Sequence, residues 1–177
     1  TQKKLFYFKD TEFKFYLSII LIFTLALTLD VSIKKYGWTL DSFRHSLFTT
    51  VSLITTTGFT TENYENWPDF SKTMIFFFMF IGGSAGSTTG ALKLIRTILV
   101  IKYLHVEVRK LLHPKGVFLV TIGNNAIKDN VVKNTLGFYL FYLAIFVICA
   151  VVLSILGMDT ITSLSASASA IGNIGPG

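Results

Sequence analysis

Long uncharged stretches alternate with charged segments along this chain. The uncharged stretches span residues 15–29, 46–61, 73–92, 134–158 and 160–177. Because a charged side chain in the middle of a bilayer costs several kcal/mol, such stretches are candidates for insertion into a membrane. The first is short for a span of roughly 17 to 25 residues, and flanking residues can extend it. The pattern predicts a helical membrane protein.

The charged segments indicate which stretches cross the membrane. Residues 1–14 contain four basic and two acidic side chains. Residues 30–72 contain four basic and five acidic ones, and residues 93–133 contain eight basic and two acidic ones. Because cytoplasmic loops carry the excess of lysine and arginine, the first and third segments are predicted to be cytoplasmic and the middle one external. The stretch 46–61 then begins and ends outside, so we expect it to re-enter the membrane rather than cross it.

The resulting order is span, re-entrant loop, span, and then span and re-entrant loop again. Residues 52–58 (SLITTTG) align with residues 169–175 (SAIGNIG), and both segments are rich in small residues and end on glycine. We therefore expect an all-α membrane protein of span–pore-loop–span repeats, with re-entrant pore helices and one broken transmembrane helix. The expected units are a complete one at 1–112, a cytoplasmic linker at 113–133 and a truncated second unit at 134–177.

The segment 55–61, Thr-Thr-Thr-Gly-Phe-Thr-Thr, offers ligands for a cation. It carries no charge, so its ligands are hydroxyl and carbonyl oxygens, and Gly58 lets successive carbonyls turn the same way. Neutral oxygens suit a monovalent cation that sheds its water, as in a carbonyl filter. A helix over 41–54 would direct the negative end of its dipole at this site. The alternative is a β-strand or a polar loop, since threonine favours strands.

A second candidate filter lies at residues 172–177, Gly-Asn-Ile-Gly-Pro-Gly. A glycine-rich turn is common in itself, and its position in the repeat is what makes it a candidate. The candidate ion-binding residues of the two loops are Thr56, Thr57, Gly58, Phe59, Asn173, Ile174 and Gly175.

Residues 73–112 would make one helix about 60 Å long, twice the hydrocarbon thickness of a bilayer. Their middle is rich in glycine and hydroxyl residues, which do not favour a regular helix. We expect a helix over 73–81, a loop, and a second helix over 91–112. Unwound backbone in a membrane lines a cavity and glycines provide hinges, so the loop is a candidate gate. Its residues are Gly82, Gly83, Ser84, Ala85, Gly86, Ser87, Thr88, Thr89 and Gly90.

Two other patterns overlap this loop. Gly82, Gly86 and Gly90 have small-xxx-small spacing, which favours close helix packing and is compatible with a break. Residues 82–86 also fit G-x-S-x-G, the motif that presents the nucleophile of many hydrolases, with Ser84 in that role. That motif needs a preceding strand and a nearby histidine and acid, whereas an apolar run precedes it here.

Lys93 and Arg96 follow the loop, three residues apart on one expected helix face. The simpler interpretation is that they snorkel to the cytoplasmic boundary. The alternative is a barrier that faces the pore and repels cations while the gate is closed.

Composition agrees with a membrane protein and narrows its partners. Hydrophobic residues make up 51% of the chain and charged residues 15%, against roughly 25% charged residues in a typical soluble domain. The net charge of +6 does not indicate nucleic-acid binding, because the basic residues flank apolar runs as the positive-inside rule expects. The single cysteine, Cys149, excludes an internal disulfide.

Several segments taken together resemble the Trk/Ktr/HKT superfamily of potassium transporters. They are TTTGFTT followed by Trp67-Pro68, then GGSAGSTTGALKLIR, then Leu112-His113-Pro114, and finally GNIGPG, in this order. Members of the superfamily carry four span–pore-loop–span units in one chain, and this sequence looks like the third unit and the fourth up to its filter. The resemblance covers essentially all 177 residues.

The resemblance implies potassium uptake through a channel-like pore, with K⁺ at the filter backbone, Gly58 and Gly175 as filter glycines, and an intramembrane gate at 82–90. Potassium would be the substrate, and no cofactor or enzymatic activity is implied. The implied partners are membrane lipid, the missing units of the pore, a second copy in a homodimer and a cytosolic nucleotide-binding regulatory subunit. The implied location is a multi-pass protein in the cell membrane, with residue 1 on the cytoplasmic side. The alternatives are a fragment inactive alone and a membrane serine hydrolase.

Overall fold

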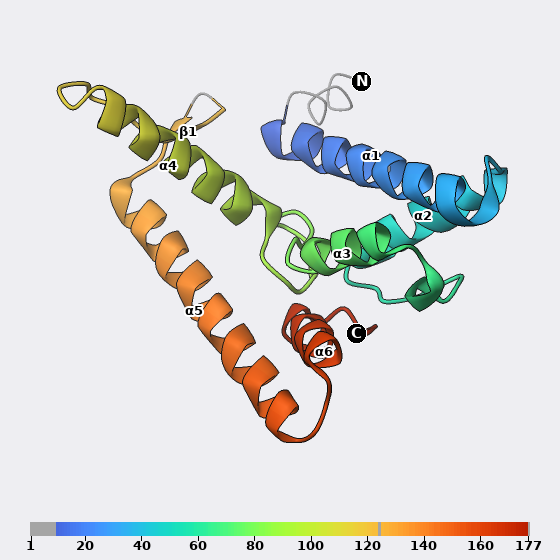
Figure 1. The fold of residues 1–177 in the computed structure, drawn as a ribbon. Coiled ribbons are helices and arrows are strands. Elements are labelled where there is room, and N and C mark those ends of the chain that lie inside the picture. Colours follow the sequence, from blue (N-terminus) through green and yellow to red (C-terminus); the bar gives the residue numbers. More distant parts are fainter. Residues whose placement is uncertain (1–9, 124, 177) are drawn as a thin grey trace.

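The computed structural model describes residues 10–123 and 125–176, and it is almost entirely helical (Figure 1). The α-helices are α1 (Thr11–Val31), α2 (Leu40–Ile54), α3 (Asp69–Phe78), α4 (Leu94–Leu112), α5 (Asp129–Ile155) and α6 (Thr160–Gly172). A π-helical turn η3 (Ser32–Tyr36) extends α1, and a 3-10 turn η4 (Tyr64–Asn66) precedes α3. The strands β1 (Thr121–Ile122) and β2 (Asn125–Ala126) form a two-residue antiparallel hairpin. The all-α prediction is confirmed, with this hairpin as an addition to it.

Two helices of the described part are long and apolar enough to cross a membrane. They are the continuous helix Thr11–Tyr36 and α5. Helix α1 begins at Thr11, before the uncharged stretch that starts at residue 15. The side chain of Asp10 caps this earlier start, because it accepts a hydrogen bond from the Glu12 N–H at 2.9 Å. Large apolar side chains are exposed along α5, as expected of a helix that faces lipid.

Helices α1, α2 and α3 pack together around the largest hydrophobic core. Leu27 and Val31 of α1 meet Leu53 and Ile54 of α2 there, and the ring of Phe78 stacks on Phe23 with centroids 3.8 Å apart. A polar contact also joins α1 to α3, since the buried Asp30 carboxylate accepts from both the N–H (3.1 Å) and the hydroxyl (2.7 Å) of Ser71. This contact satisfies an amide in the first turn of α3, which has no partner within the helix.

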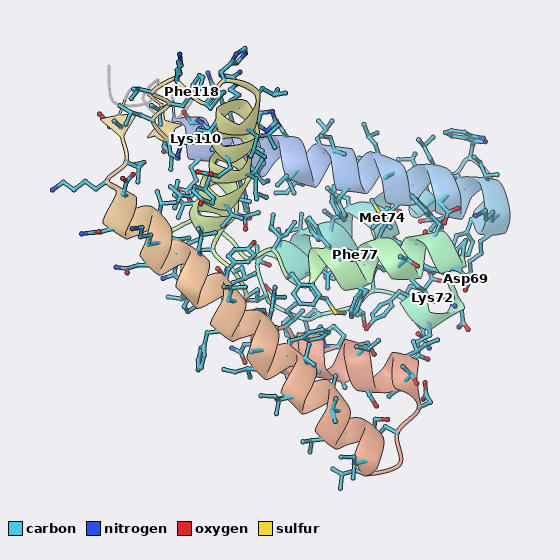
Figure 2. All side chains as sticks on the ribbon, turned by 60° about the vertical axis from the view of Figure 1, so that its left-hand side comes forward. Asp69, Lys72, Met74, Phe77, Lys110 and Phe118 are labelled. Atoms are coloured by element: carbon cyan, nitrogen blue, oxygen red, sulfur yellow. The ribbon has the colours of Figure 1, made fainter. Side chains whose placement is uncertain are left out.

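Helices α4 and α5 form a V, and α6 turns back from the end of α5 to lie beside it (Figure 1). The turned view of Figure 2 shows Lys110 and Phe118 at the far end of α4, away from Asp69 and Lys72 on α3. The Ser167 hydroxyl of α6 donates to the Phe146 carbonyl of α5 at 2.9 Å. α6 thereby carries the end of the described chain back against the α1–α2–α3 core.

The helix predicted over residues 73–112 is broken, as expected, but its halves end at other residues. α3 covers Asp69–Phe78 rather than 73–81, and α4 begins at Leu94 rather than at 91. The physical reason for the later start is a parallel bridge between Ile81 and Leu92. The Gly82 N–H donates to the Leu92 carbonyl at 2.8 Å, and the Leu92 N–H donates to the Phe80 carbonyl at 3.2 Å. These bonds hold both ends of the loop in extended backbone and keep them out of the helices.

Candidate functional site

The turn that ends α2 is a Schellman motif. Thr57 N–H donates to the Ser52 carbonyl at 2.9 Å, and Thr56 N–H donates to the Leu53 carbonyl at 2.9 Å. Thr56 has a φ of 50° and Gly58 a φ of 77°. A left-handed conformation costs a non-glycine residue about 1–2 kcal/mol, and it is least favourable for a β-branched side chain such as threonine. Such strain is found where the surrounding structure holds the residue in place, often at a functional site.

The turn that ends α6 has the same backbone. Ile174 N–H donates to the Ser169 carbonyl at 3.0 Å, and Asn173 N–H donates to the Ala170 carbonyl at 3.2 Å. Asn173 has a φ of 52° and Gly175 a φ of 112°. The aligned segments 52–58 and 169–175 therefore end on the same turn, despite their different side chains.

The two turns touch each other at their glycines. A Cβ atom built on Gly58 would lie 2.0 Å from the Ile174 carbonyl oxygen, and one built on Gly175 would lie 3.7 Å from the Gly58 Cα. Both the positive φ and the close backbone therefore restrict position 58 to glycine. At position 175 the positive φ favours glycine, but an added Cβ atom would have room.

Neutral oxygen atoms dominate the polar groups of both turns. The Ser52 hydroxyl donates to the Phe59 carbonyl at 2.7 Å, and the Thr55 and Thr57 hydroxyls lie 2.7 Å apart. In the second turn, Gly175 N–H donates to the Ser169 hydroxyl at 3.2 Å. Both turns also lie at the C-terminal end of a helix, where the backbone dipole favours a cation.

The site does not have the composition of a multivalent metal centre. No group of three or more His, Cys, Asp or Glu side chains that could hold a metal ion occurs in the described part of the chain. Asp159, the acid closest in sequence to the second turn, caps the other end of α6. Its hydrogen bond from Thr162 holds the pKa of that carboxyl below its usual value.

The loop between α3 and α4 reaches both turns through Gly90. Its N–H donates to the Thr56 hydroxyl at 3.1 Å, which gives the strained threonine a partner 34 residues away. A Cβ atom on Gly90 would lie 2.1 Å from the Gly172 carbonyl oxygen of α6. The candidate gate residues and the candidate filter residues are therefore in direct contact.

Lys93 and Arg96 have different partners. Lys93 lies immediately before α4, and its ammonium group turns back into the loop, where it donates to the Ser87 and Thr89 carbonyls. The Arg96 guanidinium lies over the Phe138 ring of α5, with 4.1 Å between its Cζ and the ring centroid. Arg96 also lines a groove of about 370 Å³ between α4 and α5.

Sequence reasoning missed three side chains that hold the site together. They are Ser52, Ser169 and Glu12, whose carboxylate accepts from the Ala85 N–H at 2.7 Å. The two serines are the first residues of the aligned segments, so their recurrence in SLITTTG and SAIGNIG was a usable signal. Glu12 gives no such signal, because its partner is 73 residues away.

Comparison with known proteins gives consistent results. A family model described as "TrkH: Cation transport protein" matches residues 2–177. The Trk system potassium uptake protein TrkH of Vibrio parahaemolyticus is 38% identical over 97% of this chain and 36% of its own length, and that of Escherichia coli K12 is 31% identical with the same coverage. The crystal structure of the potassium transporter TrkH from Vibrio parahaemolyticus matches with a TM-score of 0.90 over 98% of this chain and 37% of its own. This chain spans about a third of the length of these relatives.

Proposed function

Because this chain belongs to the TrkH family of cation transport proteins, we propose that it forms part of the path for potassium uptake through a membrane. The turns after α2 and α6 contribute the neutral oxygens of a selectivity filter, and K⁺ is the substrate. The candidate ion-binding residues remain Thr56, Thr57, Gly58, Phe59, Asn173, Ile174 and Gly175.

One observation carries this proposal. Two helices that are far apart in the sequence end in the same left-handed turn, and these turns meet at Gly58 and Gly175. A pair of equivalent turns with neutral oxygens provides what a dehydrating monovalent cation needs. A membrane hydrolase that uses Ser84 has weaker support. The relatives named above are potassium uptake proteins, and in the described part of the chain the element before Ser84 is the helix α3 rather than the strand that the hydrolase motif needs.

The loop at 82–90 acts as the gate below this filter. Its contact with the filter turns through Gly90, and the hydrogen bond of its Ala85 to Glu12, support this role. The loop moves between a closed position, which these contacts hold, and an open one in which K⁺ passes.

The working transporter contains further pore units, as the partial coverage of the relatives suggests. It forms a homodimer and binds a cytosolic nucleotide-binding regulatory subunit. Residues 1–14 and 93–133 face the cytoplasm, since they carry the excess of basic residues.

Potassium uptake by transport-deficient cells tests the filter. We expect Gly58→Ser, in the full-length transporter that carries this sequence, to abolish uptake or to admit sodium, because the added side chain displaces the Ile174 carbonyl. The matched control is Gly37→Ser, since Gly37 also has a positive φ, 72°, but no atom within 4 Å of an added Cβ. Equal uptake and equal K⁺/Na⁺ preference in the two variants, at equal amounts in the membrane, would contradict the filter assignment.

A further inference from the structure

A cluster of oxygen atoms inside the loop surrounds the ammonium group of Lys93. Nζ donates to the carbonyls of Ser87 and Thr89 (the latter at 2.8 Å), and it lies 3.2 Å from Thr89 Oγ1 and 3.4 Å from Ser87 Oγ. An ammonium group has three N–H donors, so it cannot bind these oxygens one to one. The cluster therefore resembles a coordination shell around a single positive charge.

The hydroxyl groups of this cluster turn lone pairs toward Lys93. The Ser87 hydroxyl donates its proton to the Ser84 carbonyl at 2.7 Å. At the 2.8 Å contact between the Ser87 and Thr89 hydroxyls, the donor is therefore Thr89. Gly83 N–H also donates to Thr89 Oγ1 at 3.1 Å, which fixes that oxygen in position. Both hydroxyl protons are engaged inside the loop, and the cluster is organised by bonds that do not involve Lys93.

Neutral oxygens alone solvate this half-buried charge. In the described part of the chain, every ion pair within 4.0 Å involves another lysine or arginine. Glu12, the carboxylate that contacts the loop, accepts from the Ala85 amide instead. Carbonyl and hydroxyl oxygens without a carboxylate are the surroundings that a dehydrated potassium ion takes in a filter.

We propose that this oxygen cluster is a second monovalent-cation site, and that Lys93 is its tethered occupant. The ammonium group fills the site and holds the loop closed, and K⁺ takes its place when the side chain withdraws. A ligand on the same chain competes at a high effective concentration, so free K⁺ does not displace Lys93 from the closed loop. This site rests on the proposed potassium path, and it explains why a positive side chain is tolerated in that path.

Rubidium, a potassium analogue that is located by anomalous scattering, tests the site in crystals of the full-length transporter. Lys93→Met removes the charge and keeps a side chain of similar length. We expect a rubidium peak among the Ser87 and Thr89 oxygens of this variant and none there in the unmodified protein. The turns after α2 and α6 should hold rubidium in both. Lys93→Ala is a second variant with the same expected peak, should the first fail to fold.

Lys102→Met is the matched control, because the Lys102 ammonium contacts a single carbonyl, that of Thr121, at 2.7 Å. One oxygen does not make a site, so no rubidium is expected there. Adding Ser87→Ala to Lys93→Met removes one of the four oxygens and should weaken the loop peak.

Rubidium at the turns with none in the loop of either Lys93 variant would overturn this proposal and leave the filter intact. Rubidium in the loop with none at the turns would support the loop site and contradict the filter. An unchanged loop peak after Ser87→Ala would show that the hydroxyl is not a ligand, and would overturn the four-oxygen site.

Discussion

The turns after α2 and α6 have one backbone and two different sets of side chains. Residues 52–58 and 169–175 share serine, isoleucine and glycine at three aligned positions, and they differ at the other four. The left-handed position is Thr56 in one turn and Asn173 in the other. Asparagine tolerates this conformation, whereas threonine is held in it by the hydrogen bond from Gly90. The same turn is thus stabilised locally in one unit and by a distant loop in the other.

The recurring serines show a second difference. Ser52 donates a hydrogen bond to a carbonyl, and Ser169 accepts one from an amide. Because a hydroxyl can do both, one residue type meets opposite needs at equivalent places. In the turn after α2 a serine therefore holds the Phe59 carbonyl, and in the turn after α6 a serine holds the Gly175 amide.

Among the changes that test this comparison, the largest effect is expected at Gly90, where the loop touches both turns. In Gly90→Ala, the new Cβ lies 2.1 Å from the Gly172 carbonyl, so backbone must move. Overpacking costs about 1–3 kcal/mol, and we expect potassium uptake to fall about tenfold or more. Gly86→Ala is the matched control in the same loop, because no atom lies within 4 Å of its added Cβ. Equal uptake by the two variants would contradict the gate contact and the loop's role.

Thr56 and Asn173 both have the left-handed backbone conformation, and exchanging their side-chain types should change the stability of the folded protein in opposite directions. Thr56→Asn relieves the strain of a β-branched residue and should raise the thermal stability of the purified transporter by about 1 kcal/mol. Asn173→Thr should lower it by a similar amount, because among the described residues the loop donates its hydrogen bond to residue 56 and none to the side chain of residue 173. The measurement is thermal unfolding in detergent. A loss of stability in Thr56→Asn would show that the hydrogen bond from Gly90 outweighs the strain.

The smallest effects are expected at the two serines, and they should differ in kind. Ser169→Ala removes the acceptor of the Gly175 amide. Because Gly175 is exposed and water can replace that acceptor, the loss of thermal stability should be small, about 0.5 kcal/mol. Ser52→Ala frees the Phe59 carbonyl, which can still turn to water, so its main effect should be on the K⁺/Na⁺ ratio of uptake. Ser52→Thr, which keeps the hydroxyl, should restore the ratio. Identical changes in both alanine variants would contradict the opposite roles of the serines.

The sequence predicts local structure well where charge and glycine mark it. The absence of charge locates α1, α5 and α6, and the glycines of 82–90 locate the break between α3 and α4. Helix ends are less accurate, because they depend on contacts such as the Ile81–Leu92 bridge, which joins residues on either side of the loop.

The side-chain contacts of the candidate site could not be predicted. The bond from Ala85 to Glu12 spans 73 residues and that from Gly90 to Thr56 spans 34, and neither pair has a local pattern. Lys93 was expected to extend toward water or the pore, but its direction depends on a loop whose oxygens converge only after folding. Such contacts depend on tertiary structure rather than on the spacing of residues.

The carboxylate of Asp30 also makes one helix depend on another. α3 has 10 residues, about 15 Å of helix against a hydrocarbon core of about 30 Å, so it is too short to insert as a span by itself. Its first turn is capped by Asp30, at the end of a helix that the ribosome completes some 40 residues earlier. The helix that supplies this cap is therefore synthesised before the short helix that needs it, and the Asp30 carboxylate ties the stability of α3 to that of α1.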